Sequence, residues 1–244
     1  LTKEQQEKWI NDMATYAAMI EIMDEGVGKI MDAVKAKGIY ENTVFIFLSD
    51  NGATEEGGYI GQLMSDLSNT PYRSYKQWVY QGGTSTPFIL TYGSGKKQPM
   101  KGKICHQPAH LIDILPTCMA IGKTGYPAHF AHADLEGRNL IPASEGKPLE
   151  KRTLYFEHQS SCAIIDGSWK LVRASRNTPW ELINLETDPF ETCDLSHQYP
   201  EKVEELETKW IEWANTHKVF PLENKPWTER INFYKAKNPD QSGK

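Results

Sequence analysis

The sequence predicts an α/β protein in two parts: a doubly wound sheet domain over residues 1–148 and a small α+β subdomain over residues 149–244. In the first part, helical periodicity alternates with short runs that are apolar throughout. In the second part, short β-rich segments follow one another at turn residues, and one helical pattern comes after them. Alternating helices and strands are typical of α/β domains, whereas consecutive strands with a covering helix are typical of α+β units.

The first part begins with one long amphipathic helix. Apolar residues recur at helical spacing over residues 9–37, and Gly38 follows as a C-cap. The run at residues 43–48 is apolar throughout, which predicts a strand buried on both faces, as in a parallel sheet covered by helices. A polar loop is expected from Asp50 to about residue 69, a second buried strand at residues 87–92, and a helix at residues 110–121.

The second part has a different pattern, in which short β-rich segments alternate with turn residues. Residues 122–148 are rich in Gly and Pro and are predicted to connect the two parts. The pair Asp166-Gly167 is a strong hairpin signal. A helix is predicted from Pro200 to about His217, with Pro near its first position. The chain ends in a polar tail from Asn238. The strands are predicted at residues 153–157, 162–166, 169–173 and 180–184.

Composition excludes several classes of function. The formal net charge is -5 and the lysines are scattered, so no basic stripe points to nucleic acid. No apolar run approaches the roughly 20 residues that a membrane-spanning helix needs. The 4 cysteines form no C-x-x-C pair. One or two disulfides are possible, but the sequence does not show which cysteines would pair. No signal peptide is visible, and the chain begins at Leu1, which suggests either processing or a piece of a longer protein.

Two short segments carry residues suited to chemistry. Asp50 and Asn51 directly follow the first predicted strand, and ligands bind at the carboxyl ends of strands in open α/β sheets. Their oxygens suit Ca²⁺ or Mg²⁺, although Asp-Asn-Gly is also a common turn sequence. Lys76 lies in an aromatic segment that leads through Gly82-Gly83 into the second strand. A lysine in such a segment can equally be a solvated charge over ring faces.

Taken in order, these segments resemble the sulfatase family over almost the whole chain, from about Trp9 to Pro221. The Lys76 segment is similar to the family's K-x-x-x-Y-E-G-G-x-x-x-P-F stretch, with Gln81 in place of the usual glutamate. The other segments that carry the resemblance are the helix around Met13–Glu21, Asp50-Asn51-Gly52, Asp113–Thr117, Leu135–Leu140 with Asn139 at the usual serine, Trp169-Lys170-Leu171, Trp180-Glu181-Leu182 and Asp188-Pro189-Phe190-Glu191.

The resemblance implies a fold, a chemistry and roles for individual residues. The fold would be the second half of an alkaline-phosphatase-like doubly wound domain with a C-terminal antiparallel subdomain. Sulfatases attack sulfur with a formylglycine hydrate made from Cys or Ser in a C/S-x-P-x-R motif, and a divalent cation, usually Ca²⁺, holds the sulfate. Asp50 and Asn51 would then be metal ligands, and Lys76 would bind the sulfate and stabilise the departing charge. His158, at the end of the first strand of the second part, would contact the rest of the substrate, although a surface histidine without such a role is equally compatible with the sequence.

No C/S-x-P-x-R motif occurs in the 244 residues, so the nucleophile is expected outside this chain, in a missing N-terminal half. The expected partner is therefore that half, and the expected substrate is a sulfated small molecule or glycan. Export to the periplasm or the medium is implied by the family resemblance alone. Two alternatives stay open: a phosphonate or phosphate-ester hydrolase of the same superfamily, and a non-catalytic fragment that acts as an interaction subunit. Neither the oligomeric state nor the substrate's identity can be predicted from the sequence.

Overall fold

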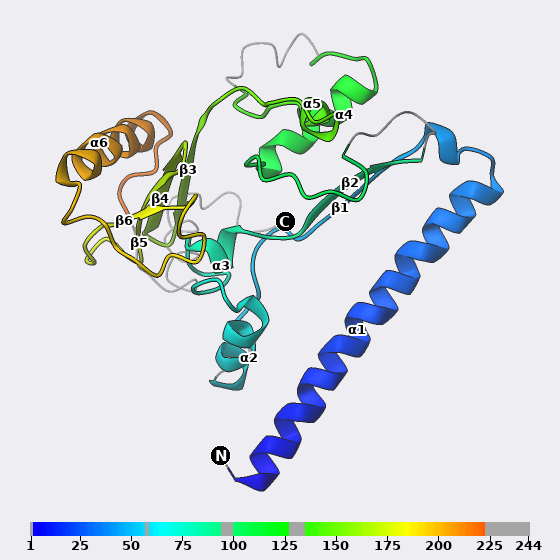
Figure 1. Ribbon diagram of the computed structural model, residues 1–244, viewed down its shortest axis with the longest axis horizontal. Helices are drawn as coiled ribbons and strands as arrows, with labels where there is room; N and C mark the ends of the chain where they lie inside the picture. The colour runs from blue at the N-terminus through cyan, green and yellow to red at the C-terminus, as the bar shows by residue number, and fades with distance from the viewer. Residues whose placement is uncertain (1, 57–58, 94–99, 127–134, 223–244) are drawn as a thin grey trace, which may run out of the picture. The chain divides into compact units, whose positions relative to one another are not determined.

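The computed structural model describes residues 2–56, 59–93, 100–126 and 135–222 (Figure 1). The chain divides into two compact units, one comprising Leu1–Asp50 with Pro87–Glu150 and the other Asn51–Thr86 with Lys151–Lys244. The segment between the first two strands thus belongs to the same unit as the C-terminal part. The division of the sequence at residue 148 stays a prediction, and the predicted polar tail from Asn238 lies outside the described residues.

The first unit begins with the predicted long helix, α1 (Lys3–Ala36), followed by the single turn η1 (Tyr40–Asn42). Thr2 and Gln5 form a capping box at the N-terminus of α1. The helix therefore begins at Lys3, six residues before the predicted start at residue 9. Gly38 adopts φ +67° just past the C-terminus, as expected of a C-cap glycine. No residue of α1 is buried. Its exposed apolar side chains include Ile10 at 67%, Met19 at 63%, Ile22 at 67% and Ile30 at 62%.

Both predicted strands of the first unit are present, as β1 (Val44–Leu48) and β2 (Phe88–Tyr92). They pair antiparallel, with Val44 opposite Tyr92 and Leu48 opposite Phe88. The expected parallel arrangement is therefore wrong for this pair, because an apolar run indicates burial and carries no information about strand direction. Burial on both faces is also not observed: every β1 residue is half-buried, and Ile89 of β2 is 56% exposed.

The helix predicted at residues 110–121 is present as η2 (Leu111–Asp113) and α4 (Ile114–Ile121), and α5 (Ile141–Ser144) is a short turn inside the predicted connection. The carboxylate of Asp113 is completely buried and accepts hydrogen bonds from the backbone N–H groups of His110 and Arg138, each at 2.8 Å. This side chain therefore anchors the loop that follows α4 to the start of the helix.

In the second unit, the expected polar loop contains a helix, α2 (Tyr59–Asn69). The prediction of a loop over these residues is wrong. Leu63 and Met64 each lie one helical turn before Leu67, and this spacing supports a helix although polar residues surround it. The short helix α3 (Gln81–Thr84) contains the Gly-Gly pair, and both glycines are buried.

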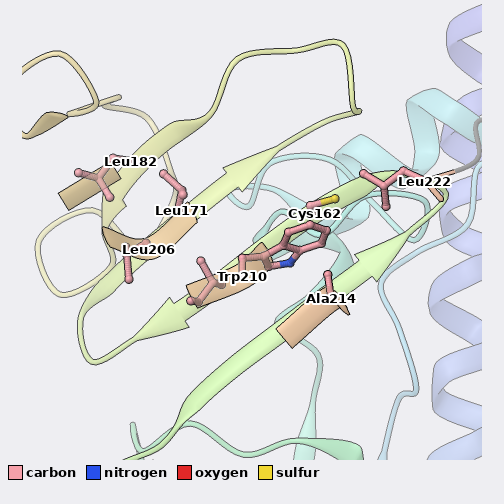
Figure 2. Close-up of a cluster of buried hydrophobic side chains, with 8 residues drawn as sticks. Cys162, Leu171, Leu182, Leu206, Trp210, Ala214 and Leu222 are labelled. Atoms are coloured by element: carbon pink, nitrogen blue, oxygen red, sulfur yellow. The ribbon is translucent and has the colours of Figure 1, made fainter. Parts of the chain in front are cut away.

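The described part of the second unit after residue 150 is a four-stranded antiparallel sheet with one covering helix, as predicted (Figure 1). The strands follow chain order: β3 (Thr153–His158), β4 (Ser161–Asp166), β5 (Trp169–Arg173) and β6 (Glu181–Asn184). The helix α6 (Pro200–Thr216) packs against β4 and β5. Trp210 of α6 is fully buried among strand residues of one face, and Figure 2 shows the cluster, which comprises Cys162, Ile164, Leu171, Leu182, Leu206, Trp210, Ala214 and Leu222.

The opposite face of the same sheet covers a different segment. Ala163, Val172 and Ile183 each follow a residue of the α6 cluster, so their side chains point to the other face. There they pack against Val79 and Tyr80, which come from the aromatic segment that contains Lys76. The sheet thus holds α6 on one face and the candidate functional segment on the other.

Neither a membrane-spanning helix nor a disulfide is present among the described residues. Within the described ranges, no helix combines the length and the apolar character required to cross a membrane. The cysteines 105, 118, 162 and 193 are all free thiols, and only Cys162 is buried.

Candidate functional site

Asp50 and Asn51 lie where the sequence predicts, directly after β1. The backbone N–H of Ser49 still donates to the carbonyl of Pro87 at 3.1 Å, so Asp50 is the first residue beyond the strand pairing. Asp50 is exposed and Asn51 is half-buried. The two side chains therefore stand at the carboxyl end of a strand, where a carboxylate and an amide oxygen can meet a ligand.

Gly52 brings this loop into close contact with the Gly-Gly pair of α3. Its N–H donates to the carbonyl oxygen of Gly83 at 3.0 Å, and a Cβ atom at this position would lie 1.8 Å from the carbonyl oxygen of Gly82. No side chain fits in that space, so glycine is required by the close approach of two backbones. The glycine of the Asp-Asn-Gly motif thus joins the loop after β1 to the segment that follows Lys76.

Lys76 is tied to the same loop through its backbone. Its N–H donates to the carbonyl of Ala53 at 2.9 Å, only two residues from Asn51. The ammonium group lies 3.8 Å from Glu56 Oε1, with side-chain exposures of 36% for Lys76 and 74% for Glu56. An exposed pair at that distance is weak, so the lysine can exchange this partner for a bound anion.

Asn69, the last residue of α2, was not singled out from the sequence. Its amide nitrogen donates to the carbonyl oxygens of Ser74 and Gly82, both at 2.9 Å, and its Oδ1 accepts the N–H of Ala53 at 3.5 Å. One side chain therefore cross-links three parts of the candidate site. The position of Asn69 at a helix end was one indication in the sequence, because asparagines there often hydrogen-bond to nearby backbone groups. The sequence did not indicate which groups these would be.

His158 lies beside the residue that follows Lys76. Its Nδ1 atom is 3.2 Å from the carbonyl oxygen of Gln77. A carbonyl oxygen only accepts, so Nδ1 carries the hydrogen, and in the neutral ring Nε2 is left as an acceptor. His158 therefore lies beside the Lys76 segment, and its role toward a substrate stays a prediction.

The turn after His158 has unusual backbone geometry. Gln159 and Ser160 have φ of 50° and 65°, and His158 pairs with Ser161 across them. Two positive φ values in a two-residue hairpin define a type I′ turn, which normally prefers Asn-Gly. The N–H of Ser160 donates to Glu157 Oε1 at 2.7 Å and helps to hold this geometry. The turn therefore holds His158 in place at a cost in backbone strain.

Under the Lys76 segment lies a buried ion pair that sequence reasoning missed. Lys170 Nζ and Glu191 Oε1 are 2.7 Å apart, and both side chains are 0% exposed. Burial lowers the pKa of Lys170, an effect that the neighbouring Glu191 carboxylate opposes. Both residues sit in segments that carry the family resemblance, but no sequence pattern indicated that they contact each other.

This ion pair belongs to a larger polar network. Glu191 Oε2 accepts the backbone N–H of Gln81 at 2.8 Å, and Lys170 Nζ donates to Gln81 Oε1 at 3.2 Å.

Arg73 Nη1 lies 2.7 Å from Glu181 Oε2, and the Tyr80 hydroxyl also bonds to that carboxylate. Burial and the bond to Glu181 raise the pKa of Tyr80. With a neutral Gln81, the two cations Arg73 and Lys170 balance the two carboxylates of this network.

The described residues alone do not form a metal site. Among residues 2–56, 59–93, 100–126 and 135–222 there is no group of three or more His, Cys, Asp or Glu side chains that could hold an ion. Asp50 and Asn51 offer the hard oxygen ligands that Ca²⁺ and Mg²⁺ prefer, but Ca²⁺ takes about 6–8 ligands in proteins. The donor chemistry of the two residues fits such a cation, which would need further ligands in addition to them.

Comparison with known protein families identifies relatives of this chain. The family model described as Sulfatase matches residues 2–123. The chain is 28% identical to an uncharacterized sulfatase of Schizosaccharomyces pombe over 86% of this chain and 45% of that protein. It is 29% identical to an N-acetylgalactosamine-6-O-sulfatase of Bacteroides thetaiotaomicron, over 80% of this chain and 40% of the relative. The chain therefore spans less than half the length of these curated relatives.

Solved structures give the same result. A crystal structure of Ps i-CgsB superposes with a TM-score of 0.71 at 26% identity, covering 90% of this chain and 47% of that one. The phosphonate monoester hydrolase of Agrobacterium radiobacter superposes with a TM-score of 0.58 at 21% identity, covering 84% of this chain and 41% of that one. The second likeness shows a shared fold alone. The predicted fold class, the second half of an alkaline-phosphatase-like domain with a C-terminal subdomain, is confirmed by these neighbours.

Proposed function

The chain belongs to the sulfatase family, and from this premise we propose that it is the C-terminal part of an enzyme that hydrolyses sulfate esters. The observation that carries the proposal is the joining of two motif segments: Gly52 bonds to Gly83, and Lys76 bonds to Ala53. These contacts bring the loop of the Asp-Asn pair against the lysine segment. The nucleophile, a formylglycine made from Cys or Ser, would lie outside this chain, in an N-terminal half.

Sulfatases are generally metal-dependent, and we propose that Asp50 and Asn51 hold the cation. One carboxylate oxygen and one amide oxygen suit a hard cation and not Zn²⁺. Ca²⁺ is preferred over Mg²⁺ on family resemblance. Such an ion would withdraw charge from the sulfate oxygens when bound. The two residues are a partial ligand set, so the N-terminal half would supply the other ligands.

Lys76 is proposed to contact the sulfate and stabilise the negative charge that develops on the leaving oxygen. Its backbone is fixed by Ala53, and its ammonium group has only the distant Glu56 carboxylate as a described partner. A fixed backbone with an exchangeable side-chain partner suits a group that must meet an incoming anion. Electrostatic stabilisation of this kind is commonly the largest contribution of an active-site cation.

His158 is proposed to contact the part of the substrate beyond the sulfate. Its bond to Gln77 sets the ring beside the Lys76 segment and leaves Nε2 for a hydroxyl group. Sulfated carbohydrates are the favoured substrates, because the relatives include an N-acetylgalactosamine-6-O-sulfatase and Ps i-CgsB is also solved with a neocarrahexaose. An aryl sulfate is the other substrate class, since an arylsulfatase of Klebsiella aerogenes is 32% identical over 48% of this chain and 31% of its own length. Export to the periplasm or the medium stays a prediction from family resemblance.

The test uses the complete open reading frame that contains this chain, with Ca²⁺ present. Sulfate release from an aryl sulfate and from a panel of 6-O-sulfated sugars should be measured for the parent protein and for Asp50→Ala, Asn51→Ala and Lys76→Ala. Each variant should lose about 100-fold or more of kcat/KM, because charge stabilisation at the transition state is removed. Lys147→Ala is the matched control, because Lys147 also pairs with a nearby glutamate but is 67% exposed. Unchanged kcat/KM in all three site variants would reject the proposed roles.

A phosphonate or phosphate-ester hydrolase is the alternative within enzymes, favoured by the shared fold with the Agrobacterium radiobacter enzyme. Metal analysis of the complete protein separates the two functions. Tightly bound Zn²⁺ with phosphonate hydrolysis would support the alternative, whereas Ca²⁺ with sulfate release supports the sulfatase.

A non-catalytic interaction subunit is the alternative outside enzymes, and the exposed apolar face of α1 favours it. Apolar side chains such as Met19 and Ile30 lie on a helix that has no buried residue. An exposed apolar face of this kind marks an interaction surface or an aggregation hazard. Sedimentation of the chain over a range of concentrations tests this: association that Met19→Glu and Ile30→Glu abolish would support docking, and a dilute monomer would weaken it.

A further inference from the structure

We propose that the buried pair Lys170 and Glu191, acting through Gln81, is a positioning device for the candidate site. This inference rests on the proposed sulfatase function for its catalytic consequence, but its structural part stands independently. None of the three side chains would touch the substrate. They would instead determine where the loop of Asn51 and the segment of Lys76 are held, relative to the four-stranded sheet.

Hydrogen bonds connect the ion pair to the glycine turn, Gly82-Gly83. Glu191 accepts the backbone N–H of Gln81 at 2.8 Å, and Gln81 is the first residue of α3. The next residue, Gly82, donates to Arg73 at 2.8 Å and has no room for a Cβ, which would lie 2.0 Å from the Ser74 carbonyl oxygen. A shift of Gln81 is therefore transmitted to the backbone of Gly82 and Gly83, because no void between them could absorb it.

Further backbone hydrogen bonds connect the glycine turn to the candidate site. Gly83 accepts the N–H of Gly52 at 3.0 Å, and Ala53 accepts the N–H of Lys76 at 2.9 Å. Asn51 immediately precedes Gly52, so its backbone moves with that contact. The ion pair, the turn and the loop thus form one continuous series of hydrogen-bonded and close-packed groups within the second unit.

Stability alone does not explain the ion pair. Removing two charges from water is costly, and buried ion pairs can often be replaced by apolar residues without loss of stability. Glu191 also has a φ of 57°, a region that non-glycine residues rarely adopt. Its carbonyl accepts Arg73 Nη1 at 2.9 Å, so its backbone as well as its carboxylate is used to hold the segment of residues 73–81. A strained, charged and fully buried residue that bonds to the candidate segment at two atoms is better explained as a positioning group.

The structural test measures amide hydrogen exchange in the chain. Lys170→Met leaves the Glu191 carboxylate buried without its cation, so exchange at the N–H groups of Gly52 and Lys76 should accelerate about tenfold more than exchange at the amide of Trp210 in α6, which reports the global loss of stability. Lys170→Met with Glu191→Gln should restore protection, because the neutral amide oxygen still accepts the N–H of Gln81. Lys209→Met is the matched control, because it breaks a half-exposed ion pair, 2.7 Å long, between Lys209 and Asp166 of the same sheet. It should change exchange at neither the Gly52 nor the Lys76 amide.

The functional test uses the complete protein. Lys170→Met should lower kcat about tenfold with little change in KM, and the double variant should recover most of the loss. If Lys170→Met does not fold, Lys170→Met combined with Glu191→Leu decides: it buries no unpaired charge but removes the acceptor of the Gln81 N–H, so exchange at Gly52 and Lys76 should still accelerate more than exchange at Trp210. Unchanged exchange at Gly52 and Lys76 in a folded variant overturns the inference, as does equal acceleration at Trp210, which would show a global loss of stability. Exchange that changes as expected in a protein without sulfate-ester activity would instead reject the proposed function and leave the positioning inference standing.

Discussion

Lys170 and Glu191 form a 2.7 Å ion pair in which both side chains are completely buried. Lys170 lies on β5, and Glu191 lies in the loop after β6. Lys170 alternates with Leu171 of the α6 cluster, so its side chain points to the face that packs against Val79 and Tyr80, and Glu191 meets it there. The pair therefore joins two parts of the C-terminal sequence under the segment that contains Lys76.

Breaking this pair should be costly for stability. Lys170→Met leaves an uncompensated buried carboxylate, and the free energy of unfolding should fall by about 3–5 kcal/mol. Lys170→Met combined with Glu191→Leu should lose distinctly less, because no charge is then buried without a partner. Urea unfolding followed by tryptophan fluorescence measures both values. A double variant that is no more stable than the single variant would contradict this account of the pair.

Gly52→Ala should destabilise the second unit, because the new Cβ would lie 1.8 Å from the carbonyl oxygen of Gly82. The backbone of one segment must move, at a cost of about 1–3 kcal/mol. Gly28→Ala in α1 is the matched control, since nothing lies within 4 Å of the added atom. It should stabilise its helix by up to about 1 kcal/mol. Thermal unfolding of both variants gives the comparison, and equal midpoints would refute the close approach.

Gln159→Gly should stabilise the hairpin between β3 and β4. Gln159 has a φ of 50°, which is unfavourable for a residue with a side chain and is readily adopted by glycine. The expected gain in the free energy of unfolding is about 1 kcal/mol. Gln198→Gly, at a position without a positive φ, should give no such gain. Chemical denaturation measures the difference, and a loss of stability in Gln159→Gly would show that its side chain contributes more than the strain costs.

Thiol alkylation should separate Cys162 from the other cysteines. Burial raises the pKa of Cys162 to about 11, and its side chain is 0% exposed. At pH 8 only about one thiol in a thousand at this site would be a thiolate. Cys105, Cys118 and Cys193 are exposed and should react with iodoacetamide first. Mass spectrometry of the native chain would show three rapid modifications, with a fourth only after unfolding; early labelling of Cys162 would contradict the packing in Figure 2.

Much of the secondary structure could be predicted from local pattern. The strands at Val44–Leu48 and Trp169–Arg173 were predicted because apolar and β-branched residues follow one another between turn signals. The helix α2 was missed, because its apolar residues are few and lie between polar loop residues. The antiparallel pairing of β1 and β2 could not be predicted, since hydrophobic pattern records which faces are covered and not the direction of the neighbouring strand.

The sequence by itself determined which residues are the candidates: Asp50, Asn51, Lys76 and His158 were selected by residue type and by their place in ordered motifs. Only the tertiary structure decided what holds them. Gly52 meets Gly83, His158 meets Gln77, and Lys170 meets Glu191 across separations that no local pattern spans. The physical reason is that residue type and periodicity express local preference and burial, whereas the partner of a buried charge or a close backbone contact depends on how distant segments pack.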